Sequence, residues 1–143
     1  MGFLATDLAV ISSTGPTTNI PVAKDVNVKA FTVARTETSA VLKVVLPGDA
    51  SIIGLRVFGG TASDAGTTAT LTFTAANNSG TISSGTYNVK TNGAVTGEVT
   101  MSGLPNIQPV PLTGDITLTA YYGETGTAST TGGPWNVLVT YIR

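Results

Sequence analysis

Residues 68–75 read Thr-Ala-Thr-Leu-Thr-Phe-Thr-Ala, a strict alternation of threonine with apolar side chains. Successive side chains of a β-strand point to opposite faces of its sheet, so a period of two is the pattern of a half-buried strand. Ala69, Leu71, Phe73 and Ala75 are therefore expected to face a core, and the threonines are expected to face water. Helical periodicity is nearly absent from the rest of the chain, so we expect strands throughout.

Two further segments, residues 95–101 and 115–122, repeat this alternation. Gly97 interrupts the first of them and predicts a β-bulge there. The side chains expected to point inward are Val95, Val99 and Met101 in the first segment and Ile116, Leu118, Ala120 and Tyr122 in the second.

Three apolar segments, residues 40–46, 52–58 and 135–142, are predicted to be strands covered on both faces. In the second of them, Ile53, Leu55 and Val57 are expected to share one face. Residues 26–33 start with apolar side chains at even positions and then change phase. That change predicts a bulge, or a strand that crosses from one sheet to the other.

About eight short strands, each followed by Gly, Pro, Asn or Asp, indicate an all-β antiparallel sandwich or barrel. Eight strands favour a jelly roll over a seven-stranded immunoglobulin-like sandwich. We expect a single β-sandwich domain over residues 26–143 and an extended N-terminal arm or edge segment over residues 1–25. Residues 123–134 are small and polar, and they are expected to form a mobile surface loop outside the core.

The composition is unusually neutral, because only 10% of the 143 residues are charged, the net charge is −1, and mean hydropathy is positive at +0.28. Average globular proteins carry about 25% charged residues. A chain without a basic excess is not expected to bind nucleic acid. With no Cys and no His, and with its eight acidic residues scattered, it is expected to hold no catalytic site, no metal and no cofactor.

Membrane spans and export signals are not expected either. No stretch approaches the roughly 20 apolar residues that a membrane helix needs. Residues 3–11 are apolar but short, lack a preceding basic residue, and contain Asp7, so they do not fit a signal peptide. We therefore expect synthesis in the cytoplasm of a host cell and no membrane partner.

Two aromatic residues need an interpretation. Trp135 opens an apolar strand and is expected in the core or at its rim. Tyr121 points away from Leu118, so it is the better candidate for an exposed ring that contacts a partner or a sugar.

The neutral surface is itself informative. A free β-sandwich usually relies on charged side chains, especially Lys, to keep its sheet edges from pairing with other chains. This chain has only seven Lys and Arg together. Low charge lets large surfaces pack against partners without desolvating ions, so the sequence predicts an assembly component.

The chain begins with a short apolar and Ser/Thr/Pro-rich segment and continues with Thr/Gly/Ala-rich strands through Trp135 to Arg143. In this overall composition it resembles the capsid decoration, or cement, proteins of tailed bacteriophages. The likeness is greatest to the jelly-roll type found in short-tailed phages. The resemblance implies a structural virion protein on the capsid exterior that binds the major capsid protein and stabilises contacts between its subunits. It also implies a partner in itself, as a homodimer or homotrimer.

The side chains expected at the interface are those of the arm, together with the exposed tyrosine: Phe3, Leu4, Leu8, Val10, Ile11 and Tyr121. The alternative function is a receptor- or glycan-binding module of a phage head or tail fibre. A third interpretation is a tail-tube or head-completion protein that forms rings.

Overall fold

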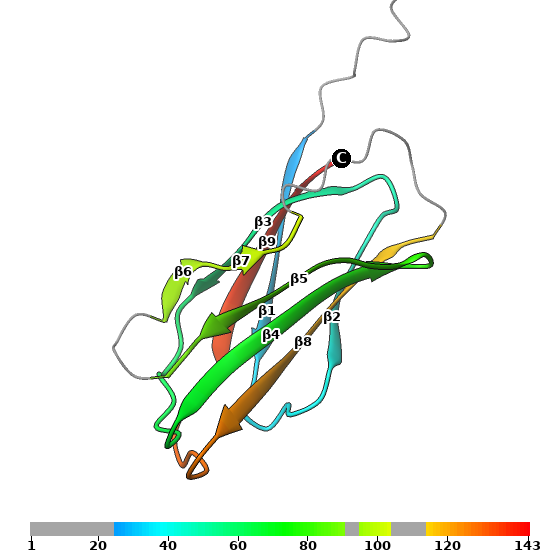
Figure 1. The fold of residues 1–143 in the computed structure, drawn as a ribbon. Coiled ribbons are helices and arrows are strands. Elements are labelled where there is room, and N and C mark those ends of the chain that lie inside the picture. Colours follow the sequence, from blue (N-terminus) through cyan, green and yellow to red (C-terminus); the bar gives the residue numbers. More distant parts are fainter. Residues whose placement is uncertain (1–24, 91–94, 104–113) are drawn as a thin grey trace, which may run out of the picture.

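A computed structural model describes residues 25–90, 95–103 and 114–143. It contains nine strands and no helix in these ranges, arranged in two antiparallel sheets that pack face to face (Figure 1). The expected β-sandwich is therefore confirmed.

One sheet has four strands and the other has five. The four-stranded sheet has the order β1-β9-β3-β6, and the five-stranded sheet has the order β2-β8-β4-β5-β7. The bounds in the four-stranded sheet are Val26–Val33 (β1), Trp135–Ile142 (β9), Ser51–Phe58 (β3) and Thr96–Glu98 (β6). Those in the five-stranded sheet are Val41–Leu46 (β2), Ile116–Thr125 (β8), Thr68–Asn77 (β4), Gly80–Asn88 (β5) and Thr100–Met101 (β7).

The strand pairing is nested, which is the topology of a jelly roll. The first strand pairs with the last (β1 with β9), the second with the next to last (β2 with β8), β3 with β6, and β4 with β5. Such a chain is a long hairpin of strand pairs rolled into two sheets. An immunoglobulin-like sandwich, with strand groups ABED and CFG, does not produce this order. The preference for a jelly roll is confirmed.

The alternation that predicted β4 and β8 holds in the structure. Along β4, Ala69, Leu71, Phe73 and Ala75 are all fully buried, and the threonines between them lie on the outer face. The expected inward residues of β8 are buried as well. Two large rings, Tyr122 and Trp135, stack at a centroid distance of 5.1 Å at one end of this core. Trp135 is thus a core residue, as expected.

None of the three segments predicted to be covered on both faces is fully covered on both; in β9 the inner face is buried and the outer side chains, Leu138 among them, are half-buried. In β2, Leu42 and Val45 are exposed, whereas Val44 and Leu46 are buried. In β3, a register shift between Ile52 and Gly54 buries Ile52 and leaves Ile53 exposed. The expected alignment of Ile53 with Leu55 and Val57 was wrong because this bulge reverses the phase.

The phase change in residues 26–33 has a different origin from the one predicted. β1 pairs with β9 residue by residue from Val26 to Val33 without a register shift. The even positions lie on the outer face, and Phe31 and Val33 face the core. The predicted bulge is therefore absent. The apolar pattern changes phase because the strand carries apolar side chains first on its outer face and then on the face that packs in the core.

The segment predicted as one strand over 95–101 is divided between the sheets. Thr96–Glu98 pairs with β3, and Thr100–Met101 pairs with β5, so the chain changes sheet at the buried Val99. Gly97 lies under Tyr87, where a Cβ would sit 2.7 Å from the tyrosine hydroxyl oxygen. The glycine therefore permits a close side-chain approach.

Gly85 has a similar role on the other side of the crossover. A Cβ there would sit 2.8 Å from Met101 Cγ and closer still to the Thr100 carbonyl oxygen. The short β7 can pair with β5 because this position has no side chain.

Candidate functional site

The outer surface of the four-stranded sheet is the strongest candidate for a functional surface. On β1 its outward side chains include Val26, Val28 and Ala30, and on β9 they include Leu138 and Ile142. Val26 is 66% exposed and Val28 is 54% exposed. The inward side chains of the same two strands pack in the core, so the backbone that carries the outward side chains is held in place. We call this surface the β1–β9 face.

The β1–β9 face continues onto the neighbouring strand. Thr140 on β9 pairs with Val28 on one side and with Gly54 of β3 on the other. Ile53 and Phe58 of β3 add two more exposed apolar side chains. Arg56 lies on β3 between these two side chains, opposite Leu138.

This side of the molecule also carries charge. Arg56 on β3 lies on the face itself, opposite Leu138 of β9, and it forms an ion pair of 3.0 Å with Glu98 on β6. At the end of the face, Arg143 Nε lies 3.2 Å from an Asp49 carboxylate oxygen. The uncharged part of the face is therefore the part formed by β1 and β9.

The outer surface of the five-stranded sheet has a different chemistry. It carries many hydroxyls: Thr74 of β4 lies opposite Thr119 of β8 and Ser84 of β5, and Thr72 lies opposite Thr86 of β5. Tyr121 lies in this surface opposite Thr72 and is half-buried, so its expected exposure is only partial. Leu42 and Val45 give the surface an apolar border along β2.

The edge strands β1 and β2 are protected by lysines. Lys29 of β1 reaches across the open side of the sandwich, and its Nζ donates to the Val45 carbonyl oxygen over 3.1 Å. A charged side chain at an edge blocks the addition of another strand. The sequence suggested that the chain has too few lysines to protect its sheet edges, but two lysines lie on the edge strands β1 and β2.

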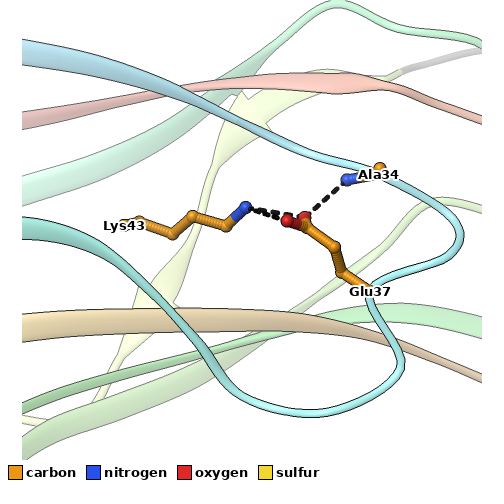
Figure 2. A network of polar contacts seen from close by, with 3 residues as sticks. All are labelled: Ala34, Glu37 and Lys43. Carbon is orange, nitrogen blue, oxygen red and sulfur yellow. Dashed lines mark hydrogen bonds and ion pairs between the residues drawn. The ribbon is translucent and has the colours of Figure 1, made fainter.

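The second lysine is Lys43 of β2. Its Nζ lies 2.6 Å from both carboxylate oxygens of Glu37, which also accept a bond from the Ala34 amide (Figure 2). The Lys43 side chain is only 9% exposed. Burial raises the pKa of the Glu37 carboxyl, but the bonds from Lys43 and Ala34 outweigh burial and leave the pKa below its ordinary value.

A second polar network surrounds the hydroxyl of Tyr122. This hydroxyl donates to Glu124 over 2.6 Å, and it lies 2.6 Å from the buried Ser63 hydroxyl. Ser129 donates its backbone N–H to the same Glu124 carboxylate, and Arg35 donates to the Ser129 carbonyl oxygen. The network joins β8 to the loop that follows it.

The two acidic groups of this network are tuned away from acid–base catalysis. Hydrogen bonds from Ser129 and Tyr122 hold the pKa of Glu124 below its ordinary value, and burial together with the bond to Glu124 raises the pKa of Tyr122. A general acid or base works best with a pKa near neutrality. The arrangement suits a structural clamp.

The loop lies mostly at the surface, as expected, but it is attached to the core at several points. β8 extends to Thr125, Ser129 is buried, and Gly133 lies against the Trp135 ring. Asp64 binds this loop through bonds from the backbone amides of residues 130 and 131 and from the Thr130 hydroxyl. These bonds, with that of the Thr130 hydroxyl foremost, lower the pKa of Asp64 to about 2. The polar composition correctly predicted a surface loop, but it gave no sign of the glycine that lies against the Trp135 ring.

Of the predicted interface residues, Tyr121 alone lies in the described part of the chain. The other five, Phe3, Leu4, Leu8, Val10 and Ile11, lie outside the described residues. The β1–β9 face was not predicted as a functional surface. The in-phase Val26, Val28 and Ala30 carried the signal, but their pattern was used only to predict a bulge or a crossing between sheets.

Among the described residues, no three His, Cys, Asp or Glu side chains gather closely enough to hold a metal ion. The same ranges contain no helix that is long and apolar enough to cross a membrane. No protein-family model, no curated protein and no solved structure matches this chain.

Proposed function

We propose that this protein is a non-enzymatic structural component of a phage virion. In this role it binds the outside of the capsid and stabilises contacts between major capsid protein subunits. The single observation that carries the proposal is the exposed apolar surface on a well-packed sandwich. Within residues 25–90, 95–103 and 114–143, six large apolar side chains are exposed to solvent: Val26, Val28, Leu42, Val45, Ile53 and Phe58.

Three of these six side chains lie at positions where a polar residue would not reduce the packing of the core. Val26, Val28 and Leu42 are each more than half exposed, so their burial in the free protein contributes little to folding. Exposed apolar side chains of this number stabilise a contact with another protein. A shell component stays covered once it is placed, which is compatible with an overall charge content of 10%.

The N-terminal arm is the proposed anchor to the capsid through Phe3, Leu4, Leu8, Val10 and Ile11. Its test is co-sedimentation with expanded capsids of the phage that encodes the protein. We expect the full chain to pellet with capsids in a fixed ratio to the major capsid protein. A variant lacking residues 1–15 is expected to remain in the supernatant with its sandwich folded. Full occupancy by that variant would overturn the role of the arm, and a full chain that never pellets would overturn the proposal.

A second candidate function, glycan binding, is favoured by the surroundings of Tyr121. Its ring lies among uncharged hydroxyls, opposite Thr72 on β4 and two residues from Gly123, which has no side chain to cover it. Aromatic rings stack on sugar faces, and hydroxyls bond to them. Saturable binding on a glycan array that is lost in Tyr121→Ala and kept in Thr86→Ala would favour this function. Cryo-electron microscopy of the intact particle separates the candidates, because copy number and location differ for shell, fibre and ring proteins.

A further inference from the structure

We infer that Lys29 and Lys43 prevent the side of the sandwich between β1 and β2 from pairing with a strand of another chain, and that the protein associates with itself edge to edge once both charges are removed. The inference goes beyond the proposed function and does not rest on it. Its evidence is the backbone of β1, the position of Lys29, and the contacts of Lys43.

The two edge strands lie next to each other. β1 is the outermost strand of the four-stranded sheet, β2 is the outermost strand of the five-stranded sheet, and the two are in contact. In the described part of the chain, β1 pairs only with β9, and β2 pairs only with β8. Each strand therefore turns one row of backbone groups toward the open side of the sandwich.

The backbone of β1 offers a regular edge to an incoming strand. Asp25 and Arg143 exchange both of their backbone hydrogen bonds, and such pairs alternate along an antiparallel ladder. Since β1 follows β9 from Val26 to Val33 without a register shift, its odd-numbered residues bond to β9. The even-numbered residues therefore direct their N–H and C=O groups to the open side. An exposed edge of this length, with apolar side chains, is the kind that pairs with other chains.

Lys29 obstructs this edge from the inner side of the sheet. It has the same parity as Phe31 and Val33, which pack in the core, so its side chain starts on the inner side of β1. Its Nζ crosses to β2 and donates to the Val45 carbonyl oxygen over 3.1 Å. The bond occupies a backbone acceptor of β2 and holds a charge beside β1. A strand added to either edge would cover this ammonium group, and the burial of an unpaired charge is costly.

Lys43 and Glu37 protect another part of the open side (Figure 2). Lys43 lies at the register shift between Leu42 and Val44, so β2 has no regular edge there. The Lys43 side chain is nearly buried and pairs with Glu37, which also accepts the Ala34 N–H over 2.8 Å. Ala34 is the next even-numbered residue after β1, so this carboxylate occupies the donor that would extend the edge.

The test is the self-association of the isolated protein, measured by sedimentation velocity from micromolar to millimolar concentration. We expect the double variant Lys29→Met/Lys43→Met to form larger species at a concentration at least about 10-fold lower than the wild type does, because no charge then opposes strand addition. The control is Lys90→Met, which removes a lysine that donates to the Gly66 carbonyl oxygen over 2.9 Å but lies outside both edge strands. Lys29→Arg keeps the charge and is expected to behave as the wild type. A double variant that associates like the wild type, or no more than Lys90→Met does, would overturn the inference.

Amide hydrogen exchange then identifies where the copies meet. In the wild type, the amides of Val28, Ala30 and Thr32 face the open side and are expected to exchange faster than those of Asn27 and Phe31, which bond to β9. In the associated double variant the first three should become protected, because a second strand bonds to them. Association that leaves these amides unprotected comes from another surface or from unfolding, and it would overturn the inference. None of these measurements involves capsids, so their failure leaves the proposed function standing, and a full chain that never pellets with capsids leaves this inference standing.

Discussion

Tyr122→Phe removes one oxygen atom from the network that holds the loop after β8. The hydroxyl of Tyr122 makes two bonds of 2.6 Å, to Ser63 and Glu124, and a longer one of 3.4 Å to Ser129. The ring itself, stacked on Trp135, is unchanged by the substitution. The variant therefore isolates the contribution of the hydrogen bonds from that of packing.

The expected loss follows from the burial of the partners. A buried hydrogen bond contributes about 1 kcal/mol net, and a buried partner left unsatisfied adds about 1 kcal/mol or more. Ser63 is fully buried and loses its side-chain partner, although it still accepts from the Ala65 amide. We expect Tyr122→Phe to lower the free energy of unfolding by about 2 kcal/mol. With a urea m-value of about 2 kcal/mol/M, the midpoint shifts by about 1 M.

The neighbouring residue supplies the control. Tyr121 has the same side chain, but it points to the outer surface of the five-stranded sheet. Tyr121→Phe is expected to change the free energy of unfolding by less than about 0.5 kcal/mol. Equal midpoints for the two variants would refute the view that the Tyr122 network stabilises the fold.

Three further predictions use the same urea assay. The pKa of Asp64 is lowered from 3.8 to about 2, so its contribution to stability is present above about pH 4 and lost as the pH falls toward 2; Asp64→Asn should show a flatter acid limb than the wild type, and parallel limbs would contradict this. Lys43→Met should lower the free energy of unfolding by about 1 kcal/mol, whereas Arg56→Met, whose pair is exposed, should lower it by less than about 0.5 kcal/mol; the reverse order would contradict the assignment of the buried pair. Gly85→Ala should cost about 1–3 kcal/mol, and Gly123→Ala, with nothing closer than 3.8 Å to its new Cβ, should cost almost nothing; equal losses would show that β7 adapts.

Strand positions and the jelly roll could be predicted from the sequence because the period-two pattern is local. β4 and β8 each alternate small polar and apolar residues, so one face of each strand had to be buried. The jelly roll was predicted as a preference and the strand order was not predicted, since a register such as Val26 with Ile142 depends on contacts between distant parts of the chain.

The exposed apolar face could not be predicted, for a physical reason. An apolar side chain has the same sequence signature whether it faces a core or the solvent, so the pattern at Val26 and Val28 does not show that both are more than half exposed. The reversal at Ile53 arises from a bulge, and its position is set by pairing with β9. The loop over Trp135 was missed because small residues carry no apolar pattern, although Gly133 contacts the ring and Ser129 is buried.

The nested pairing of the strands has a consequence for the order in which the molecule can form during synthesis. β9 is a central strand of its sheet and lies between β1 and β3, which are made much earlier. Until Trp135–Ile142 leaves the ribosome, the strand that pairs with both β1 and β3 is missing, and their apolar side chains stay in solvent. Folding that depends on such distant contacts is slow. A nascent chain is therefore open to aggregation for nearly the whole of its translation, and truncation before Trp135 removes the strand that connects β1 to β3.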